Sequence, residues 1–195
     1  ADILAAREDL REVEGQVMLS VIRAYIDVRR DEQNLAIRRD MFELQSSGTF
    51  WLSETPDRPS KGWDAAYRRV ATFSHVVDRS SGERYLVINT HLDNEGQTAR
   101  LEASRQILRW VSANRLRGEH LVLTGDMNAE AGSPPLRELT RVLNDARKVS
   151  KRPAVGPEGT FNNFQPLPGA APRIDYVLAD PSLSVERYAV LAWHF

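Results

Sequence analysis

The sequence predicts an α/β domain that follows a long amphipathic helix. Two observations lead to this prediction. The first 45 residues place apolar side chains at helical spacing, whereas the remainder alternates short apolar runs of strand length with helical stretches. The full length of 195 residues is enough for one well-buried domain with an appendage.

The composition is that of a globular protein and excludes several kinds of site. Apolar residues make up 42% of the chain and charged residues 27%, which argues against extensive disorder. The absence of cysteine excludes disulfide scaffolds, zinc–thiolate sites, iron–sulfur clusters and thiol nucleophiles. A formal net charge of −1 gives the whole chain no general attraction to nucleic acid or to anionic membranes.

The N-terminal segment, residues 1–45, contains no proline and a single glycine. Its net charge is −3, against +2 for the rest of the chain. Apolar side chains recur at spacings of three, four and seven residues, which is typical of one face of a helix: Leu10, Val13, Val17, Val21, Ala24, Val28 and Leu35. The run Ser46-Ser47-Gly48 predicts that the helix breaks there.

Beyond this break the pattern alternates between strands and helices. Strands are expected at Val70–Val77, Tyr85–Asn89, Leu121–Thr124 and Ile174–Leu178, and helices at Thr98–Ala113 and Pro134–Leu143. Gly82 marks a turn that predicts a hairpin between the first two strands, and Ser133 is the expected N-cap of the second helix. The proline-rich stretch Arg152–Pro172 predicts a long irregular loop.

Three strand ends carry consecutive polar residues. These runs are NTHLD (89–93), GDMN (125–128) and RIDY (173–176). Each run alone is also compatible with ordinary turn chemistry, and a histidine after a strand is more often structural than catalytic. Asp175 is different, because a carboxylate between Ile174 and Tyr176 must be desolvated, hydrogen-bonded or functional.

If these strands are neighbours, four polar side chains converge on one rim of the sheet: His91, Asp126, Asn128 and Asp175. Carboxylates, an amide and an imidazole, without a nucleophilic serine pattern, favour metal-assisted attack of water on a phosphate.

The runs NTHLDN, LTGDMNA, GTF and RIDYVLA, in this order, resemble the endonuclease/exonuclease/phosphatase superfamily. The upstream run FWLSETPDRPSKGWDAAYRRVATF is similar to the small bacterial branch of that superfamily, and the resemblance covers residues 49–188. It implies a four-layer α/β/β/α sandwich, of which this chain would hold a part, and hydrolysis of phosphoesters by a phosphodiesterase, nuclease or phosphatase that depends on Mg²⁺ or Mn²⁺.

The resemblance also implies roles for individual residues. Asp126 matches the aspartate that orients and deprotonates the attacking water, and Asn128 the asparagine that holds a phosphate oxygen or a metal-bound water. His91 matches the histidine near the scissile phosphate, and Asp175 the buried acid that orients the site. The metal ligands implied are Asp126 and Asn128.

Supporting roles are expected for four more residues. Thr160 in GTF is an orienting hydroxyl, and Arg100 could reach phosphate, although an exposed or packing arginine explains it equally well. Glu54 and Asp64 lie in family-like runs and are candidate partners of His91.

Some motifs of the superfamily have no match in this sequence. They are an early strand that ends in asparagine, a Gln-Glu pair whose glutamate is the principal Mg²⁺ ligand, and a terminal Ser-Asp-His. Trp193 precedes His194 where that motif has aspartate, so His194 is not assigned its role. Since Mg²⁺ requires carboxylate oxygens, loss of its main ligand is expected to weaken metal binding and turnover.

The N-terminal helix has a separate resemblance. Residues 7–44, which include AYIDVRRDEQNL, are similar to a helical segment of TolC-type outer-membrane efflux proteins. The expected organisation is therefore an efflux-like helix at 1–45, a junction at 46–48 and an incomplete catalytic-type domain at 49–195. The alternative function is a non-enzymatic chimeric fragment or an interaction module that self-associates through the helix.

The sequence assigns neither a cellular location nor a substrate. No signal peptide and no apolar run of transmembrane length is visible, and both cytoplasm and periplasm are compatible with the sequence. A local basic stretch could follow the phosphates of nucleic acid, although a solvated surface is the favoured interpretation: Arg137, Arg141, Arg147, Lys148, Lys151 and Arg152. Nucleic acid, phosphoinositide and other phosphodiesters all remain candidates.

Overall fold

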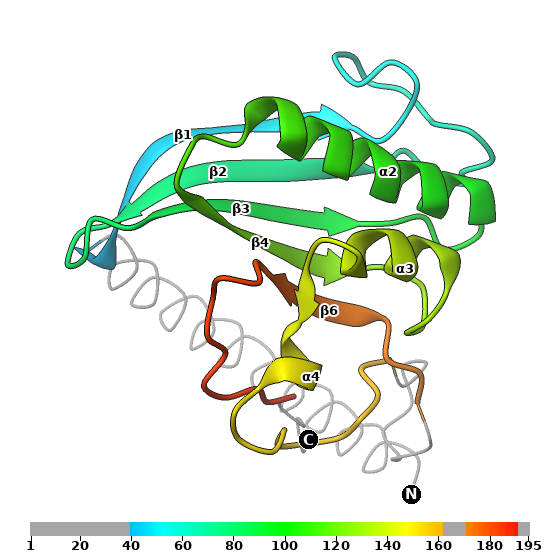
Figure 1. The fold of residues 1–195 in the computed structure, drawn as a ribbon. Coiled ribbons are helices and arrows are strands. Elements are labelled where there is room, and N and C mark those ends of the chain that lie inside the picture. Colours follow the sequence, from blue (N-terminus) through cyan, green and yellow to red (C-terminus); the bar gives the residue numbers. More distant parts are fainter. Residues whose placement is uncertain (1–39, 162–170, 191–195) are drawn as a thin grey trace, which may run out of the picture. The chain divides into compact units, whose positions relative to one another are not determined.

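A computed structural model of the chain describes residues 40–161 and 171–190 (Figure 1). The chain divides into compact units at residues 1–43 and 44–195, and the second unit carries the features described below. Its elements, with the strand that leads into it, are β1 (Phe42–Trp51), β2 (Val70–Asp78), β3 (Arg84–His91), α2 (Gln97–Asn114), β4 (Glu119–Asp126), α3 (Pro134–Thr140), β5 (Asn144–Asp145), α4 (Ala146–Val149) and β6 (Asp175–Ala179).

The strands form one mixed sheet in the order β1-β2-β3-β4-β6-β5. Strands β2 and β3 are antiparallel and are joined by a hairpin whose Gly82 has a φ of 75°. Strands β3 and β4 run parallel, with α2 as the crossover between them, whereas β6 is antiparallel to both β4 and β5. The carboxyl ends of β3 and β4 and the start of β6 therefore meet at one edge of the sheet.

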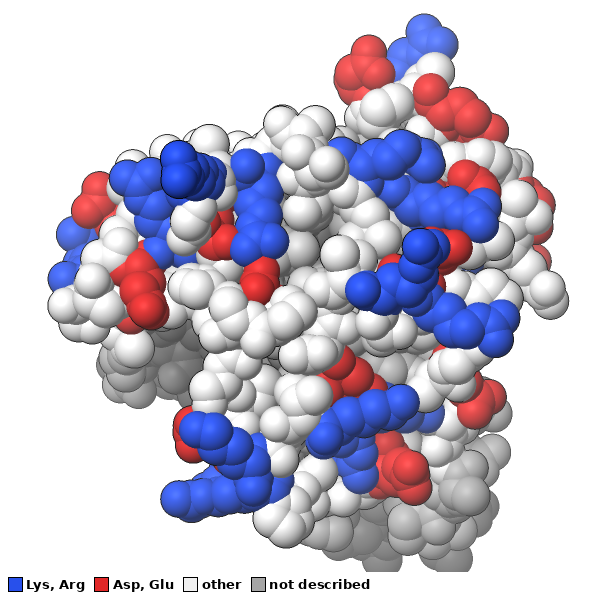
Figure 2. Space-filling view, in the orientation of Figure 1, with Lys and Arg blue, Asp and Glu red and all other residues white. Residues whose placement is uncertain are grey.

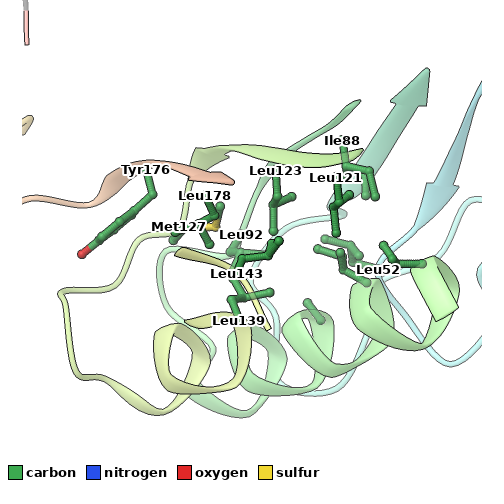
Figure 3. Packing of buried hydrophobic residues seen from close by; sticks show 14 of the residues in the cluster. Leu52, Ile88, Leu92, Leu121, Leu123, Met127, Leu139, Leu143, Tyr176 and Leu178 are labelled. Carbon is green, nitrogen blue, oxygen red and sulfur yellow. The ribbon is translucent and has the colours of Figure 1, made fainter. Parts of the chain in front are cut away.

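Helices α2 and α3 lie over one face of this sheet and bury the core against it (Figure 1). Alternate residues of the central strands point to this face because side-chain direction has a period of two along a strand. Figure 3 shows these strand side chains against the leucines at the end of α3 and just after it. The members of the core cluster include Leu52, Leu86, Ile88, Leu92, Ile107, Leu121, Leu123, Met127, Leu136, Leu139, Leu143, Tyr176 and Leu178.

The intervening residues of the same strands point to the opposite face. On each of three strands, a buried residue on the helix side fixes the direction of its neighbours. Thr90 on β3 and Tyr176 on β6 are buried there, as is Leu123 on β4. His91, Asp175 and Asp126 are an odd number of residues from these and therefore lie on the other side of the sheet. The fold thus separates the apolar core from the polar strand ends.

The predicted α/β class is confirmed, and the four central strands and both helices occur where the sequence predicts them. The predicted partial four-layer sandwich is seen only as one six-stranded sheet with helices on one face, within the residues that the structure describes.

Two local expectations were wrong. β1 begins at Phe42 and runs through Ser46-Ser47-Gly48, so residues 42–45 are not helical and the predicted break is part of a strand. The side chains of this strand are largely exposed, which explains the polar sequence that suggested a break. α3 ends at Thr140 rather than at Leu143. Ser133 is the N-cap residue of α3, as expected, although its hydroxyl makes no capping hydrogen bond.

The other N-terminal predictions fall outside the described residues. They are the helix over residues 1–39, its resemblance to efflux proteins and self-association through it. The division of the chain into two unrelated fragments also stays a prediction. Among the residues that the structure describes, no helix has the length and apolarity needed to cross a membrane.

The core contact of β4 leads to a prediction about stability. Leu123 is about 1% exposed and lies between the sheet and the helices. Leu123→Ala should lower the free energy of unfolding by roughly 2–5 kcal/mol, because it removes buried methyl groups and leaves a cavity. Urea titration followed by circular dichroism measures this change. The control Val177→Ala, at a position that is 37% exposed on β6, should cost much less; equal losses would contradict the described burial.

Candidate active site

Three polar side chains lie in one row across β3, β4 and β6. The register pairs His91 with Asp126 across the parallel strands, and Asp126 with Asp175 across the antiparallel ones. All three point to the sheet face that the helices leave uncovered. The convergence predicted from the sequence therefore results directly from strand pairing, with no contribution from a long loop.

His91 and Asp126 are in contact. The Nε2 atom of His91 lies 3.4 Å from Oδ2 of Asp126, and their side chains are 55% and 27% exposed. The other carboxylate oxygen of Asp126 accepts a hydrogen bond from the backbone N–H of Asn128, at 2.8 Å. Asp126 is thus a partly exposed carboxylate, with His91 at one oxygen and the N–H of Asn128 at the other. This position suits a group that accepts a proton from a bound water.

Gly125 allows this approach. Its φ is 148°, and a Cβ atom at this position would lie 1.9 Å from the carbonyl oxygen of Thr90 on β3. Any side chain would force β3 and β4 apart just before their last paired residues, His91 and Asp126. The glycine of the GDMN run is therefore needed to keep the imidazole and the carboxylate together.

Asn128 follows in a left-handed conformation, with a φ of 44°, which asparagine tolerates better than most residues. Its Nδ2 donates to the carbonyl oxygen of Leu92 at 2.9 Å and so ties the loop after β4 to the end of β3. One amide N–H and the side-chain oxygen have no protein partner among the described residues and remain able to bind a ligand.

Thr160 fixes the start of β6. Its hydroxyl oxygen accepts hydrogen bonds from the backbone N–H groups of Ile174 and Asp175, both at 3.1 Å. The orienting function expected of this hydroxyl is consistent with these contacts. Asp175 itself is half-buried, and no described residue hydrogen-bonds its carboxylate. The orienting role expected of this acid stays a prediction.

A family model matches residues 35–194, and its description is "Endonuclease/Exonuclease/phosphatase family". The chain belongs to this family. Its members are metal-dependent phosphoester hydrolases. The match includes every residue of the row described above and both loops that flank it.

Solved structures of the family are similar to the chain. The mannosyl-6-phosphatase Bt3783 of Bacteroides thetaiotaomicron is 35% identical, with a TM-score of 0.72, over 78% of this chain and 58% of its own. A family protein from Bacteroides vulgatus is 33% identical, with a TM-score of 0.73, over 78% of this chain and 60% of its own. The chain thus spans less than two thirds of the length of these relatives. No curated protein matches it.

The human Nocturnin catalytic domain shares the fold at a greater distance. It is 19% identical, with a TM-score of 0.54, over 73% of this chain and 49% of its own. At this level of identity the likeness concerns the architecture alone.

Asp93 is a residue whose role the sequence did not predict. Its side chain is buried, and its two oxygens accept hydrogen bonds from the backbone N–H groups of Ala66, Tyr67, Glu95 and Gly96 at 2.8–3.2 Å. Burial alone would raise the pKa of Asp93, but these hydrogen bonds hold the pKa well below its ordinary value of 3.8. The carboxylate therefore anchors the 62–69 loop beside the end of β3, two residues from His91.

The described contacts of Glu54 and Asp64, the expected partners of His91, are with backbone N–H groups, and their pairing with His91 stays a prediction. The carboxylate of Glu54 accepts the N–H of Trp63, at 3.3 Å from both oxygens. Asp64 accepts the N–H groups of Ala99 at 2.6 Å and Thr98 at 3.2 Å in the first turn of α2. Burial raises the pKa of Asp64, but the hydrogen bonds lower the pKa by more, so it lies below its ordinary value. The described contacts of both acids are therefore structural, and the described contact of His91 is with Asp126.

Arg100 also has a structural contact. Its Nη1 donates to the carbonyl oxygen of Asp93 at 2.9 Å, which links the first turn of α2 to the end of the NTHLD run. The described contact supports the packing interpretation of this arginine, and its remaining N–H groups have no described partner.

The described residues do not complete a magnesium site. Among residues 40–161 and 171–190, no group of three His, Asp or Glu side chains is arranged to hold a metal ion. Both oxygens of Asp126 already have protein partners. Asp126 and Asn128, the metal ligands implied by the sequence, offer one carboxylate and one amide oxygen, which is a weak donor set for a hard cation.

The anchor at Asp93 leads to a prediction about acid stability. A carboxyl group with a lowered pKa stabilises the folded state above its unfolded pKa, and this contribution is lost as the pH falls. Unfolding free energy should therefore decline steeply below about pH 4. Asp93→Asn should lower stability at pH 7 by roughly 1–3 kcal/mol and flatten this decline.

Urea denaturation at a series of pH values measures both effects. The matched control is Asp57→Asn, because Asp57 is exposed and makes no hydrogen bond or salt bridge to a described residue. A control whose pH profile changed as much as that of Asp93→Asn would exclude Asp93 as the source of the acid sensitivity.

Proposed function

We propose that the row of His91, Asp126 and Asp175, with Asn128, is a phosphoester-hydrolysing site in which Asp126 activates the attacking water. The observation that carries this proposal is the paired register of three functional side chains on one sheet face, with the imidazole of His91 3.4 Å from Asp126. Membership of a family of phosphoester hydrolases supports the same chemistry.

The proposed reaction is hydrolysis by direct attack of water. The carboxylate of Asp126 accepts a proton as the water oxygen bonds to phosphorus, the bond between phosphorus and the ester oxygen breaks, and that oxygen leaves as an alcohol after taking a proton from solvent. The imidazole of His91 contacts Asp126 and lies beside the proposed phosphate position, and Asn128 donates its free amide N–H to a phosphate oxygen.

Asp175 has a different proposed task. Its carboxylate is across the β4–β6 register from Asp126, and a second negative charge nearby disfavours approach of an unneutralised phosphate. We assign it to orienting a bound water. The backbone that carries it is held by Thr160.

Small phosphate esters fit this site better than duplex nucleic acid. In the local basic stretch, for which a solvated surface was the favoured interpretation, Arg141 pairs with Glu138 and Lys151 with Glu186. Figure 2 shows acidic side chains beside basic ones on the helix-covered face of the sheet. The similarity to a mannosyl-6-phosphatase makes a phosphorylated sugar the first substrate to assay.

The proton-acceptor role predicts a loss of activity on substitution. Asp126→Asn should lower kcat by about 10²–10⁴-fold, because an amide cannot accept the proton of the water. The release of inorganic phosphate from p-nitrophenyl phosphate and from mannose 6-phosphate measures this. Asp57→Asn should retain the activity of the parent chain. Turnover that is absent from the parent chain, or that survives in Asp126→Asn, would refute the proposal.

The incomplete donor set predicts weak metal binding. We expect isothermal titration of the full chain with MgCl₂ or MnCl₂ to give a dissociation constant of about 1 mM or weaker, because few charged ligands are available to the cation. Micromolar affinity that disappears in Asp126→Asn would show that a complete metal site exists. Asp57→Asn is again the control for a change in net charge.

A further inference from the structure

A pocket of about 510 Å³ lies between the loop that follows β4, helix α4 and the two chain segments that precede β6. In Figure 1, helix α4 is yellow, the loop that follows α4 is gold, and the segment at the start of β6 is orange. Its volume is within the range of about 300–1,000 Å³ that is usual for small-molecule sites. None of the predictions from the sequence concerns it.

The walls of this pocket continue directly from the candidate active site. Glu130 follows Asn128 by two residues, Gly159 immediately precedes Thr160, and Arg173 precedes Asp175 by two. The pocket therefore borders the chain segments that carry Asn128, Thr160 and Asp175.

One of the charged side chains in the pocket is already neutralised. Arg173 forms a two-pronged ion pair with Asp145, in which Nη1 lies 3.0 Å from Oδ1 and Nη2 contacts Oδ2. Both side chains are nearly buried, and the guanidinium also lies over the ring of Tyr176, with 4.3 Å from Cζ to the ring centroid. Arg173 therefore forms a rigid wall and is not free to bind an anion.

Four other charged side chains lack an ionic partner among the described residues. Glu130, Glu158 and Lys148 are exposed and form no hydrogen bond or salt bridge with a described residue. Arg147 donates a long bond, 3.4 Å, to the carbonyl oxygen of Pro157, and its Cζ lies 5.8 Å from the ring centroid of Tyr188. Two carboxylates and two cations thus border the pocket with no net charge.

The charges and the residue types that line the pocket argue against two kinds of ligand and favour a third. A second phosphate would require an excess of cations, and a nucleobase would require an aromatic ring for stacking, which none of the described lining residues supplies. Hydroxyl groups both donate and accept hydrogen bonds, so they suit carboxylate acceptors beside cationic donors.

We propose that this pocket binds a neutral, polyhydroxylated leaving group, such as the ring of a hexose, with Glu130 and Glu158 accepting hydrogen bonds from its hydroxyls. The proposal rests on the proposed function, because the phosphate must lie at Asp126 for its ester group to reach the pocket. Glu130 and Glu158 would then select among phosphate esters without taking part in the chemistry.

The experiment compares the binding of glucose 6-phosphate, inorganic phosphate and adenosine 5′-monophosphate to the full chain by isothermal titration and by the NMR signals of His91. We expect glucose 6-phosphate to bind about tenfold more tightly than phosphate, as hydrogen bonds to charged groups allow. In the double variant Glu130→Ala/Glu158→Ala this ratio should fall to near one, with the affinity for phosphate unchanged.

The matched control is Glu83→Ala, an exposed glutamate at the far end of β3 from His91, which should keep the parent ratio. Equal affinity for glucose 6-phosphate and phosphate, an unchanged ratio in the double variant, or tighter binding of the nucleotide would each overturn the pocket assignment alone. If inorganic phosphate leaves the His91 signals unshifted, the proposed function fails and the assignment fails with it.

Discussion

The close parallel pairing of β3 with β4 is the constraint on which the site depends. It holds the ends of the two strands level, so that the last residue of one faces the last residue of the other, and it tolerates no side chain at Gly125. Because β6 pairs with β4 on the other side, a third polar residue is brought into the same row. The helices then need only cover the opposite face, where the hydrophobic cluster packs away from the polar strand ends.

Much of this arrangement could be predicted from the sequence because it follows from strand periodicity. Apolar runs that end in His91 and Asp126, and a run that begins at Asp175, are sufficient to place polar groups at strand ends, and side-chain alternation decides their face. The strand order and register could not be read in this way, since they depend on pairings between distant segments. The family motifs supplied what periodicity could not, namely that these three strands are neighbours.

The contacts that the sequence did not reveal are those of carboxylates whose partners are backbone N–H groups. Glu54 and Asp64 were expected to pair with His91, but each binds N–H groups at a turn or a helix start. Asp93, in the middle of the most informative motif, received no role at all. A side chain that binds the backbone of a loop leaves no residue-type pattern in that loop, so such contacts are invisible in the sequence alone. The polar strand β1 was missed for a related reason, because its exposed side chains carry no alternation.

The two carboxylates that bind backbone have a joint consequence for dynamics. Asp64 lies in the loop and binds α2, whereas Asp93 lies just before α2 and binds the loop, so each segment is attached to the other by two separate anchors. Neither segment can move away from the other without breaking the hydrogen bonds of both carboxylates. The amide hydrogens of Ala66, Gly96 and Ala99 should therefore exchange with solvent in a single cooperative opening, as one subglobal unit whose stability differs from that of the sheet.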